Sequence, residues 1–543
     1  MILDERQYQG FLEELHDLKK FQLDYSVDNP AARVDWDDPD VQRIIEALAF
    51  FGARTHLAAQ RSLEGTQQRL YQQFFPYLLT PLPATAMIQA KPTAQLTEDL
   101  VLDVGTEFEL QPEKGGSGMF CLTRSLRILP MELIDVKQEP QIGQGVRLLL
   151  SFQAFYPLNE EIGALNLHIN YLNDYSLSLK TFCFFKQSLK AVNVQFGEYD
   201  SEKALGICNF KLGLPEENIE TDIWAHPLEA ERHYFHFPRQ ELYLDLELPP
   251  MPRNWTQFTI ALDCNESLPR QLRLHKDLFQ LFTAPLINNQ RNYAQPVVCD
   301  GTKERYTIRH PQPELGFRLQ KIQGVYEVTE EGMIPLRNGI LAGGNASYEI
   351  EQGLQYKEGG YLYSLVPHFP SAFESPRTLV VDAFWQQPWY DLYINKSYTL
   401  AMFHRQEPGV KWELVDTVFP HSENLRINSA GEYIHLLTIL HKTSFNLQNI
   451  KDLLISLGSV STSPFSSILN ALAGMRMDEY SLGGVDNRIN KQVYCLQFEA
   501  QLTASNELID TFVLHVGKVL DIWISDVLVE TSWEIQDDID SGF

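Results

Sequence analysis

Cysteine is scarce and scattered in this chain. The six cysteines are Cys121, Cys183, Cys208, Cys264, Cys299 and Cys495, and no two of them have C-x-x-C spacing. Cysteines so far apart match neither the ligand spacing of structural zinc sites nor a dense disulfide framework. We therefore expect free, buried thiols in a reducing compartment, and no metal.

Long apolar runs are also missing. No stretch approaches the ~18 consecutive apolar residues that a membrane-spanning helix requires. The N-terminus, MILDERQYQ, lacks the basic region and apolar segment of a signal peptide. These absences predict a protein without direct membrane insertion.

Basic residues are few relative to acidic ones. Lys and Arg number 44 against 71 Asp and Glu, which gives a formal net charge of −27. Binding to nucleic acid needs clustered Lys and Arg against the phosphates, so we expect no nucleic-acid partner. The acidic excess is explained either by solubility of the surface or by docking onto basic protein subunits.

The common catalytic motifs are absent as well. The chain has no G-x-x-x-x-G-K-[ST] phosphate loop, no H-E-x-x-H and no G-x-S-x-G. His226, His233 and His236 lie close together, but their aromatic surroundings favour packing over a metal site. Asp38 and Asp40 stand at a predicted helix start, where capping explains them. We expect no enzymatic activity, no catalytic residue and no cofactor.

The chain has ample material for folded domains. Its 543 residues are 44% hydrophobic and 11% aromatic, and this length predicts about three or four domains. We predict an α+β fold with a helical N-terminal region, a β-rich middle of sandwich or wing-like domains, and a mixed C-terminal domain. The predicted boundaries are 1–85, 86–305, 306–425 and 426–543.

Helical patterns dominate the first region. Residues 1–24 have an apolar face of helical period. A second helix begins after Asp38, which suits the N-cap, with Pro39 in the first position. Gly65 is expected to break it, and a further helix then reaches Pro76. The segment FPYLLTPLP, residues 75–83, is predicted to leave as an extended, proline-punctuated arm that docks on another surface.

The helix after Asp38 is apolar on nearly every side. One face carries Val41, Ile44, Ile45 and Leu48, while Phe50 and Phe51 widen the apolar surface. Such a helix is buried between two layers. Those layers belong either to its own fold or to a bundle shared with other chains.

From residue 86 the apolar pattern changes to the alternation of β-strands. The segment 226–249 predicts a helix that ends in an aromatic plug and is followed by an edge strand. Helices are expected again at 433–440, 447–457, 467–475 and 504–523. The predicted strands lie at 87–90, 100–104, 107–110, 119–123, 126–129, 146–153, 164–171, 176–185, 191–196, 306–309, 324–328, 361–366, 379–384, 390–394 and 493–500.

Two motifs carry a resemblance to a known family. The first runs from Asp38-Pro39-x-Val41 through Glu46-Ala47-x-Ala49-Phe50 to an arm with Pro76, Leu79, Pro81 and Pro83. The second is Tyr234-Phe235-x-Phe237-Pro238. Together they resemble the TssF family (also called VasA or ImpG), which are baseplate proteins of the bacterial type VI secretion system. The sequence departs from the family pattern at Phe75 and Leu78, where the family has tyrosine.

The resemblance implies a structural subunit. Two copies of this chain with one TssG would form a wedge of the baseplate around the VgrG spike hub, in contact with TssE, the sheath and the TssK adaptor. The resemblance implies a place in the bacterial cytoplasm, docked at the inner face of the inner membrane. It also implies that the N-terminal helices enter a bundle with TssG and the second copy. The residues expected there are Val41, Ile44, Ile45, Leu48, Phe50, Phe51, Phe74, Phe75 and Tyr77.

A rival interpretation is a carbohydrate-binding β-sandwich module or an enzyme. The stretch FWQQPWY holds Trp385 and Trp389, which in this interpretation form a stacking platform for a sugar. A corner of the aromatic core or a contact between subunits explains the same residues.

Overall fold

The computed structural model describes the residues that the following ranges contain: 5–30, 38–113, 116–141, 145–200, 205–213, 226–339, 346–355, 360–370, 375–393, 398–403, 407–422, 438–439, 442–457, 463–482, 489–524 and 527–536. The chain divides into two compact units. The first comprises Met1–Pro76 with Ile427–His441, and the second comprises Tyr77–Arg426 with Lys442–Phe543. The division into four domains predicted from the sequence stays a prediction.

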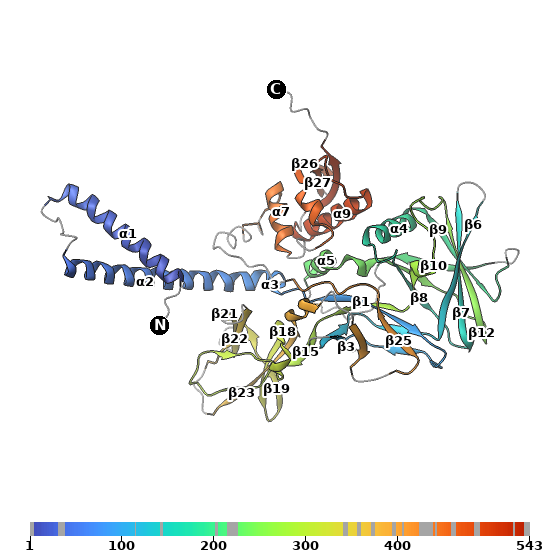
Figure 1. Cartoon of the computed structure of the whole chain (residues 1–543), viewed down its shortest axis with the longest axis horizontal. Coiled ribbons are helices and arrows are strands. Elements are labelled where there is room, and N and C mark those ends of the chain that lie inside the picture. Colours follow the sequence, from blue (N-terminus) through green and yellow to red (C-terminus); the bar gives the residue numbers. More distant parts are fainter. Residues whose placement is uncertain are drawn as a thin grey trace, which may run out of the picture. The chain divides into compact units, whose positions relative to one another are not determined.

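The first unit is built on a helical hairpin. Figure 1 shows α1 (Glu5–Asp28) folded back along α2 (Pro39–Phe74). The backbone NH of Asp40 donates to Asp38 Oδ1 at 2.9 Å, as expected for a capping aspartate. Gly65 does not end the helix as predicted, because α2 continues through it to Phe74. A single glycine costs a helix only about 1 kcal/mol, which its neighbours offset.

The contact surface between α1 and α2, which we call the seam, is narrow. Ile45, Ala49 and Ala53 are buried there, with exposed fractions of 9%, 0% and 4%. Gly52 of α2 lies so close to α1 that an added Cβ would be 3.2 Å from Glu14 Oε2. Small residues at intervals of three and four bring the helix axes together, but they bury little apolar area.

The second unit begins with a six-stranded sheet of order β24-β3-β4-β14-β1-β25, whose described pairings are antiparallel. This sheet joins strands that lie far apart in the sequence, on both sides of residue 305. A short helix, α3 (Pro76–Leu79), precedes it. The strands of the six-stranded sheet are β1 (Thr85–Pro92), β3 (Glu107–Pro112), β4 (Gly118–Leu122), β14 (Thr283–Ile287), β24 (Tyr398–Met402) and β25 (Val410–Leu414). A separate two-stranded sheet is formed by β2 (Leu100–Leu102) and β5 (Leu126–Ile128).

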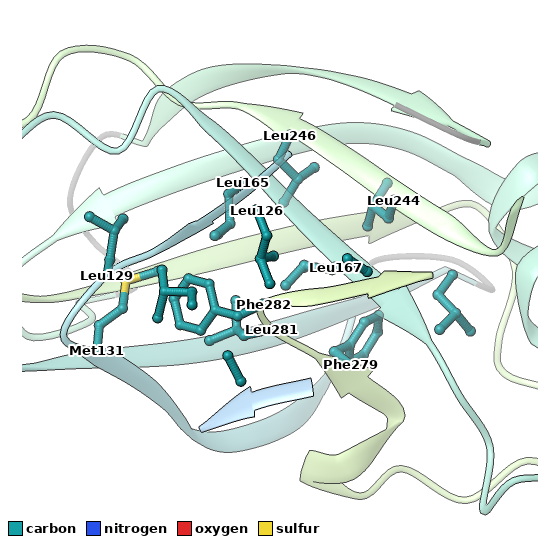
Figure 2. Close-up of a cluster of buried hydrophobic side chains, with 14 of the residues drawn as sticks. Leu126, Leu129, Met131, Leu165, Leu167, Leu244, Leu246, Phe279, Leu281 and Phe282 are labelled. Atoms are coloured by element: carbon teal, nitrogen blue, oxygen red, sulfur yellow. The ribbon is translucent and has the colours of Figure 1, made fainter. Parts of the chain in front are cut away.

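An eight-stranded antiparallel sheet follows, of order β13-β8-β11-β10-β9-β12-β7-β6. The strand after the aromatic plug, β11, is an interior strand between β8 and β10, so the predicted edge position is wrong. Figure 2 shows the leucine- and phenylalanine-rich core of this region. The strands are β6 (Met131–Pro140), β7 (Val146–Leu158), β8 (Ala164–Ile169), β9 (Leu189–Phe196), β10 (Gly206–Leu212), β11 (Tyr243–Glu247), β12 (Trp255–Cys264) and β13 (Phe279–Gln280).

Two helices interrupt this sheet in the sequence. The first is α4 (Tyr175–Ser188), which lies where a strand was predicted at 176–185. Asp174 caps it by accepting a hydrogen bond from the NH of Leu177 at 3.0 Å, and this cap overrides the alternating pattern. The second is α5 (Pro227–His236), which ends in the predicted aromatic plug, since Tyr234, Phe235 and Phe237 are buried. The 3-10 helix η2 (Pro238–Glu241) follows it.

Two further sheets pack around Trp385 and Val381 to form a small sandwich. One has β23 at its centre, and the other has the order β17-β22-β21-β20. The strand predicted at 390–394 is wrong, because the 3-10 helix η5 (Pro388–Tyr393) occupies it. The remaining elements are β15 (Gln290–Tyr293), β16 (Val297–Cys299), β17 (Tyr306–Thr307), β18 (Arg318–Thr329), β19 (Gly332–Pro335), β20 (Arg337–Asn338), β21 (Ser347–Gln355), β22 (Gly360–His368), β23 (Arg377–Gln386), η3 (Lys276–Leu278) and η4 (Pro313–Leu315).

The C-terminal elements form a mixed layer. Strands β27 (Ile489–Phe498) and β28 (Leu528–Ile535) are parallel and joined by α9 (Asn506–Trp523), while β26 (Leu472–Leu482) is antiparallel to β27. The helices α7 (Leu447–Ser456) and α8 (Ser466–Asn470) precede them. The helix predicted at 467–475 therefore ends at Asn470. The helix predicted at 433–440 lies outside the described residues, except for 438–439.

The predicted α+β class is confirmed by this arrangement of helices and sheets. Among the described helices, none combines the length and hydrophobicity needed to cross a lipid bilayer.

Candidate partner-binding surface

The outer face of α2 exposes large apolar side chains. Ile44, Leu48 and Phe51 follow one another at helical spacing and are 61%, 55% and 62% exposed. We call these three residues the α2 stripe. The stripe lies on a different side of the helix from the seam that Ile45, Ala49 and Ala53 make with α1. Within the first unit, α1 covers one side of α2 and leaves this stripe in water.

A second exposed apolar pair lies on α1. The rings of Phe21 and Tyr25 stack with centroids 6.0 Å apart, and they remain 67% and 49% exposed. The sequence analysis placed the partner-binding residues on α2 and at Phe75 and Tyr77 of the arm, and missed this pair. The signal was present, because an aromatic residue at i and another at i+4 share one helix face.

The structure separates the residues predicted for the bundle. Beyond the stripe, Phe50 is 37% exposed on another side of α2, and Val41 is half-buried beside the seam. Ile45 belongs to the seam itself. Phe75 and Tyr77 are buried, with 0% and 6% exposed, so neither offers a surface to another chain. The side chain of Phe74 lies outside the part of the structure that is described.

From Tyr77 onward the predicted arm is docked within the second unit, but it is not extended throughout as predicted, because Pro76–Leu79 form the short helix α3. Its residues from Pro81 to Ala84 are buried, and Leu82 pairs with Ser422 in an isolated bridge. Arg232 of α5 donates from Nη1 to the carbonyl of Tyr77 at 2.7 Å. His236 Nε2 lies 3.1 Å from the carbonyl of Pro83. The arm has few donors because of its prolines, and α5 supplies donors to its carbonyls.

The same helix α5 also holds the C-terminal elements. Arg232 Nε donates to the carbonyl of Leu457 at 2.7 Å. Glu231 Oε2 lies 2.6 Å from Nδ1 of His515, and the ring of Tyr234 stacks on the His515 ring at 3.4 Å. This buried polar joint was not predicted. The only sequence signal was a Glu-Arg pair inside an aromatic stretch.

The three clustered histidines take part in packing and hydrogen bonds. His226 stacks on Tyr77 with ring centroids 3.9 Å apart and also caps α5. Burial lowers the pKa of His236 to about 3, which keeps that ring neutral. In the described parts of the chain, no group of three or more His, Cys, Asp or Glu side chains is placed to hold a metal ion.

The tryptophans of the rival interpretation do not form a platform. Trp385 is only 1% exposed, and its indole NH donates to the carbonyl of Asn292 at 2.9 Å. Trp389 is half-buried and packs over Gly316. A sugar needs the face of an exposed ring, and the face of Trp385 is already occupied by the sandwich core.

Comparison with known proteins bears on these surfaces. Residues 9–200 match the model of the family described as "Type VI secretion system, TssF". This segment contains α2 and the arm. The resemblance to the TssF family is confirmed. No curated protein matches the chain.

This chain shares its fold with chains of solved structures over nearly its whole length. It is similar to a chain in the cryo-electron microscopy structure of the type VI secretion system TssK-TssF-TssG baseplate subcomplex, with a TM-score of 0.72 and 14% identity over 93% of this chain and 99% of that one. A chain in a structure of the baseplate complex from the type VI secretion system matches with a TM-score of 0.61 and 13% identity, over 97% and 96%. At these identities, the likeness concerns the fold.

Proposed function

We propose that this chain is a structural subunit of the baseplate of a bacterial type VI secretion system. The single observation that carries the proposal is a fold shared with a chain of a TssK-TssF-TssG subcomplex over 93% of this chain and 99% of that chain. The match to the TssF family over residues 9–200 supports it from the sequence side. The role is assembly rather than catalysis.

The α2 stripe is the proposed contact with a TssG-like partner. Three apolar side chains more than half exposed at helical spacing are the feature that a helical bundle covers. The pair Phe21 and Tyr25 on α1 offers a second apolar surface to the same bundle. A second copy of this chain is proposed as the other member, with two copies for each TssG.

The wider assembly follows from the same proposal. The wedge would contact the TssK adaptor, TssE, the VgrG spike hub and the sheath, and would support sheath assembly. Its place would be the bacterial cytoplasm at the inner face of the inner membrane, without inserting into it and without binding nucleic acid. The family match and the similarity to a chain of a TssK-TssF-TssG subcomplex support the TssK and TssG contacts.

The test is co-expression of the full chain with a TssG-like protein, followed by mass measurement with light scattering. The wild-type chain should form a complex with two copies of this chain for each partner. The variant Leu48→Asp places a carboxylate in the α2 stripe and should abolish co-purification. Leu514→Asp is the matched control, because Leu514 is a helical leucine with 48% exposure, close to the 55% of Leu48.

The two variants distinguish a lost contact from a lost fold. Both should keep the circular dichroism spectrum and thermal midpoint of the wild-type chain, since each replaces an exposed side chain. A wild-type chain that stays monomeric beside its partner would remove the baseplate proposal. Retained binding by Leu48→Asp would keep the baseplate role but move the contact away from α2.

A further inference from the structure

The strand β28 is an edge of the C-terminal sheet. The order of this sheet is β26-β27-β28, and no other strand pairs with β28 among the described residues. All 8 residues of β28 stay in register with β27, from Leu528 opposite Lys491 to Ile535 opposite Phe498. An edge of this length offers its backbone groups to a further strand.

Alternate residues of β28 direct their backbone groups away from β27. The NH of Gln536 donates to the carbonyl of Phe498 at 2.8 Å, so the even-numbered residues face β27. The residues that point their NH and C=O groups outward are Val529, Thr531, Trp533 and Ile535. In the described part of the chain, these outward groups have no backbone partner. The edge therefore presents a row of donors and acceptors that only another strand can pair in full.

Three other edge strands of the second unit carry features that hinder such pairing. A bulge interrupts β6 between Leu133 and Asp135, and another interrupts β26 between Leu472 and Gly474. The strand β19 has only 4 residues and ends at Pro335, which has no NH. Bulges, prolines, lysines and short strands are the usual protection of a sheet edge. The strand β28, with the sequence LVETSWEI, has none of them.

The side chains of β28 alternate between two faces. Thr531 and Trp533 point toward α9: the Thr531 hydroxyl donates to a carbonyl of α9 at 3.0 Å, and the Trp533 indole NH donates to Asp510 Oδ1 at 2.6 Å. Glu530 and Glu534 therefore lie on the opposite face of the sheet, and both are exposed. We call this second face, which α9 does not cover, the open face.

Acidic side chains outnumber basic ones on the described part of the open face. Lys491 Nζ lies 2.6 Å from Glu530 Oε1. Arg476 forms an ion pair with Asp478 at 3.3 Å and also interacts with Glu534. Three carboxylates thus share two cations, and β28 itself has two acids and no base. An added strand with Lys or Arg gains from this charge, whereas a second copy of β28 would place like charges side by side.

We propose that β28 accepts an extended segment of a protein partner as a further strand, and that this segment alternates basic and apolar residues. The backbone of the segment pairs with the outward NH and C=O groups of β28. Its basic side chains lie on the open face beside Glu530 and Glu534. Its apolar side chains lie on the side of α9, beside Val529 and Trp533.

The test is calorimetric titration of the full chain with a capped synthetic peptide of alternating Lys and Val, about as long as β28. Two further peptides carry N-methyl groups, one at every Lys and the other at every Val. Only one edge of the bound peptide faces β28, so one N-methylated peptide should bind at least about tenfold more weakly than the other. Attraction by charge alone predicts equal binding, because the two peptides have the same composition and charge.

Charge variants test the place of binding. Glu530→Lys combined with Glu534→Lys should weaken binding of the unmodified peptide at least about tenfold. Glu98→Lys combined with Glu266→Lys is the control, since both residues are exposed outside this sheet and the net charge changes equally. Amide hydrogen exchange gives a second readout on the wild-type chain. The peptide should slow exchange at Thr531, whose NH points outward.

Four results would overturn the proposal: no saturable binding, equal binding of the two N-methylated peptides, equal losses in the two double variants, or unchanged exchange at Thr531. Slow exchange at Thr531 in the free chain, together with a dimeric mass, would also overturn it, because a second copy would then occupy the edge. These outcomes concern β28 alone and do not depend on the baseplate proposal.

Discussion

The helices α2 and α9 are both amphipathic, but the apolar face of α9 is buried and part of the apolar surface of α2 is exposed. On α9, the apolar residues Leu508, Ile509, Phe512, Val513, Val516, Val519 and Leu520 are all buried. On α2, the apolar residues of the stripe are more than half exposed. The difference lies in what each unit provides as cover: α9 packs on β28, α4 and α5, whereas α2 packs along α1. Amphipathicity shows that a face must be covered, but not which chain covers it.

Replacing one phenylalanine in each helix should show the difference in burial between α9 and α2 most clearly. Phe512 is 0% exposed and contacts the rings of Phe235, Phe465 and Phe498. Phe512→Ala should destabilise the second unit by about 3–5 kcal/mol, because it leaves a cavity in the core. Phe51→Ala should cost less than about 0.5 kcal/mol in the isolated chain. Thermal unfolding of both variants measures the contrast, and equal losses would show that α2 is covered within this chain.

The buried joint on α5 should give the next largest effect. Arg232→Gln removes the donors to the carbonyls of Tyr77 and Leu457, both at 2.7 Å. Unpaired buried carbonyls should cost about 3 kcal/mol and raise the rate of proteolysis in the arm. Arg476→Gln is the control, because its ion pair with Asp478 is exposed on both sides, at 60% and 44%, and such a pair contributes only about 0–1 kcal/mol. Equal protease sensitivity in the two variants would show that the arm is held by its apolar contacts alone.

Much of the fold was predictable from periodicity. The strand positions at Met87, Leu148 and Leu379 followed from alternation, and α9 followed from its helical stripe. The failures have local causes. The YSLSL pattern in α4 alternates like a strand, but the cap at Asp174 and packing against other elements made it a helix. The interior place of β11 could not be predicted, since strand order depends on pairings distant in sequence.

The candidate site was predicted only in part. Ile44, Leu48 and Phe51 are exposed as a shared bundle requires, whereas Phe75 and Tyr77 are buried. All of them are apolar residues near one helix, and the sequence pattern does not distinguish an apolar side chain inside a fold from one awaiting a partner.

Acidification should lower the free energy of unfolding of the second unit, because its buried histidines resist protonation. Burial lowers the pKa of His168 to about 4 and of His236 to about 3, from 6.5 when exposed. Below pH 6.5 the unfolded chain binds protons that the folded chain does not, so stability falls as pH falls, by up to about 1.4 kcal/mol per pH unit for each histidine. Above pH 6.5 this contribution is fully present.

One buried acid opposes that trend. Burial raises the pKa of Glu241 from 4.5 to about 7, so the folded chain binds an extra proton between these values and gains stability as pH falls. The variant His236→Gln should therefore show a shallower loss of thermal midpoint from pH 6.5 to 4.5. Glu241→Gln should show a steeper one. Parallel curves for wild type and both variants would contradict the assignment of these groups.

The smallest effect compares a glycine in each helix. Gly52→Ala should stabilise the α1–α2 hairpin by about 0.5 kcal/mol, because alanine favours a helix by about 1 kcal/mol over glycine. The added Cβ would lie 3.2 Å from Glu14 Oε2, and this flexible carboxylate can move aside. Gly517→Ala in α9 should instead destabilise by about 1–2 kcal/mol, since its Cβ would lie 2.6 Å from Thr531 Oγ1. Helicity during thermal unfolding reports both changes. A gain at both positions would mean that α9 is no more tightly packed than α2, and the contrast between the covered and the uncovered helix would fail.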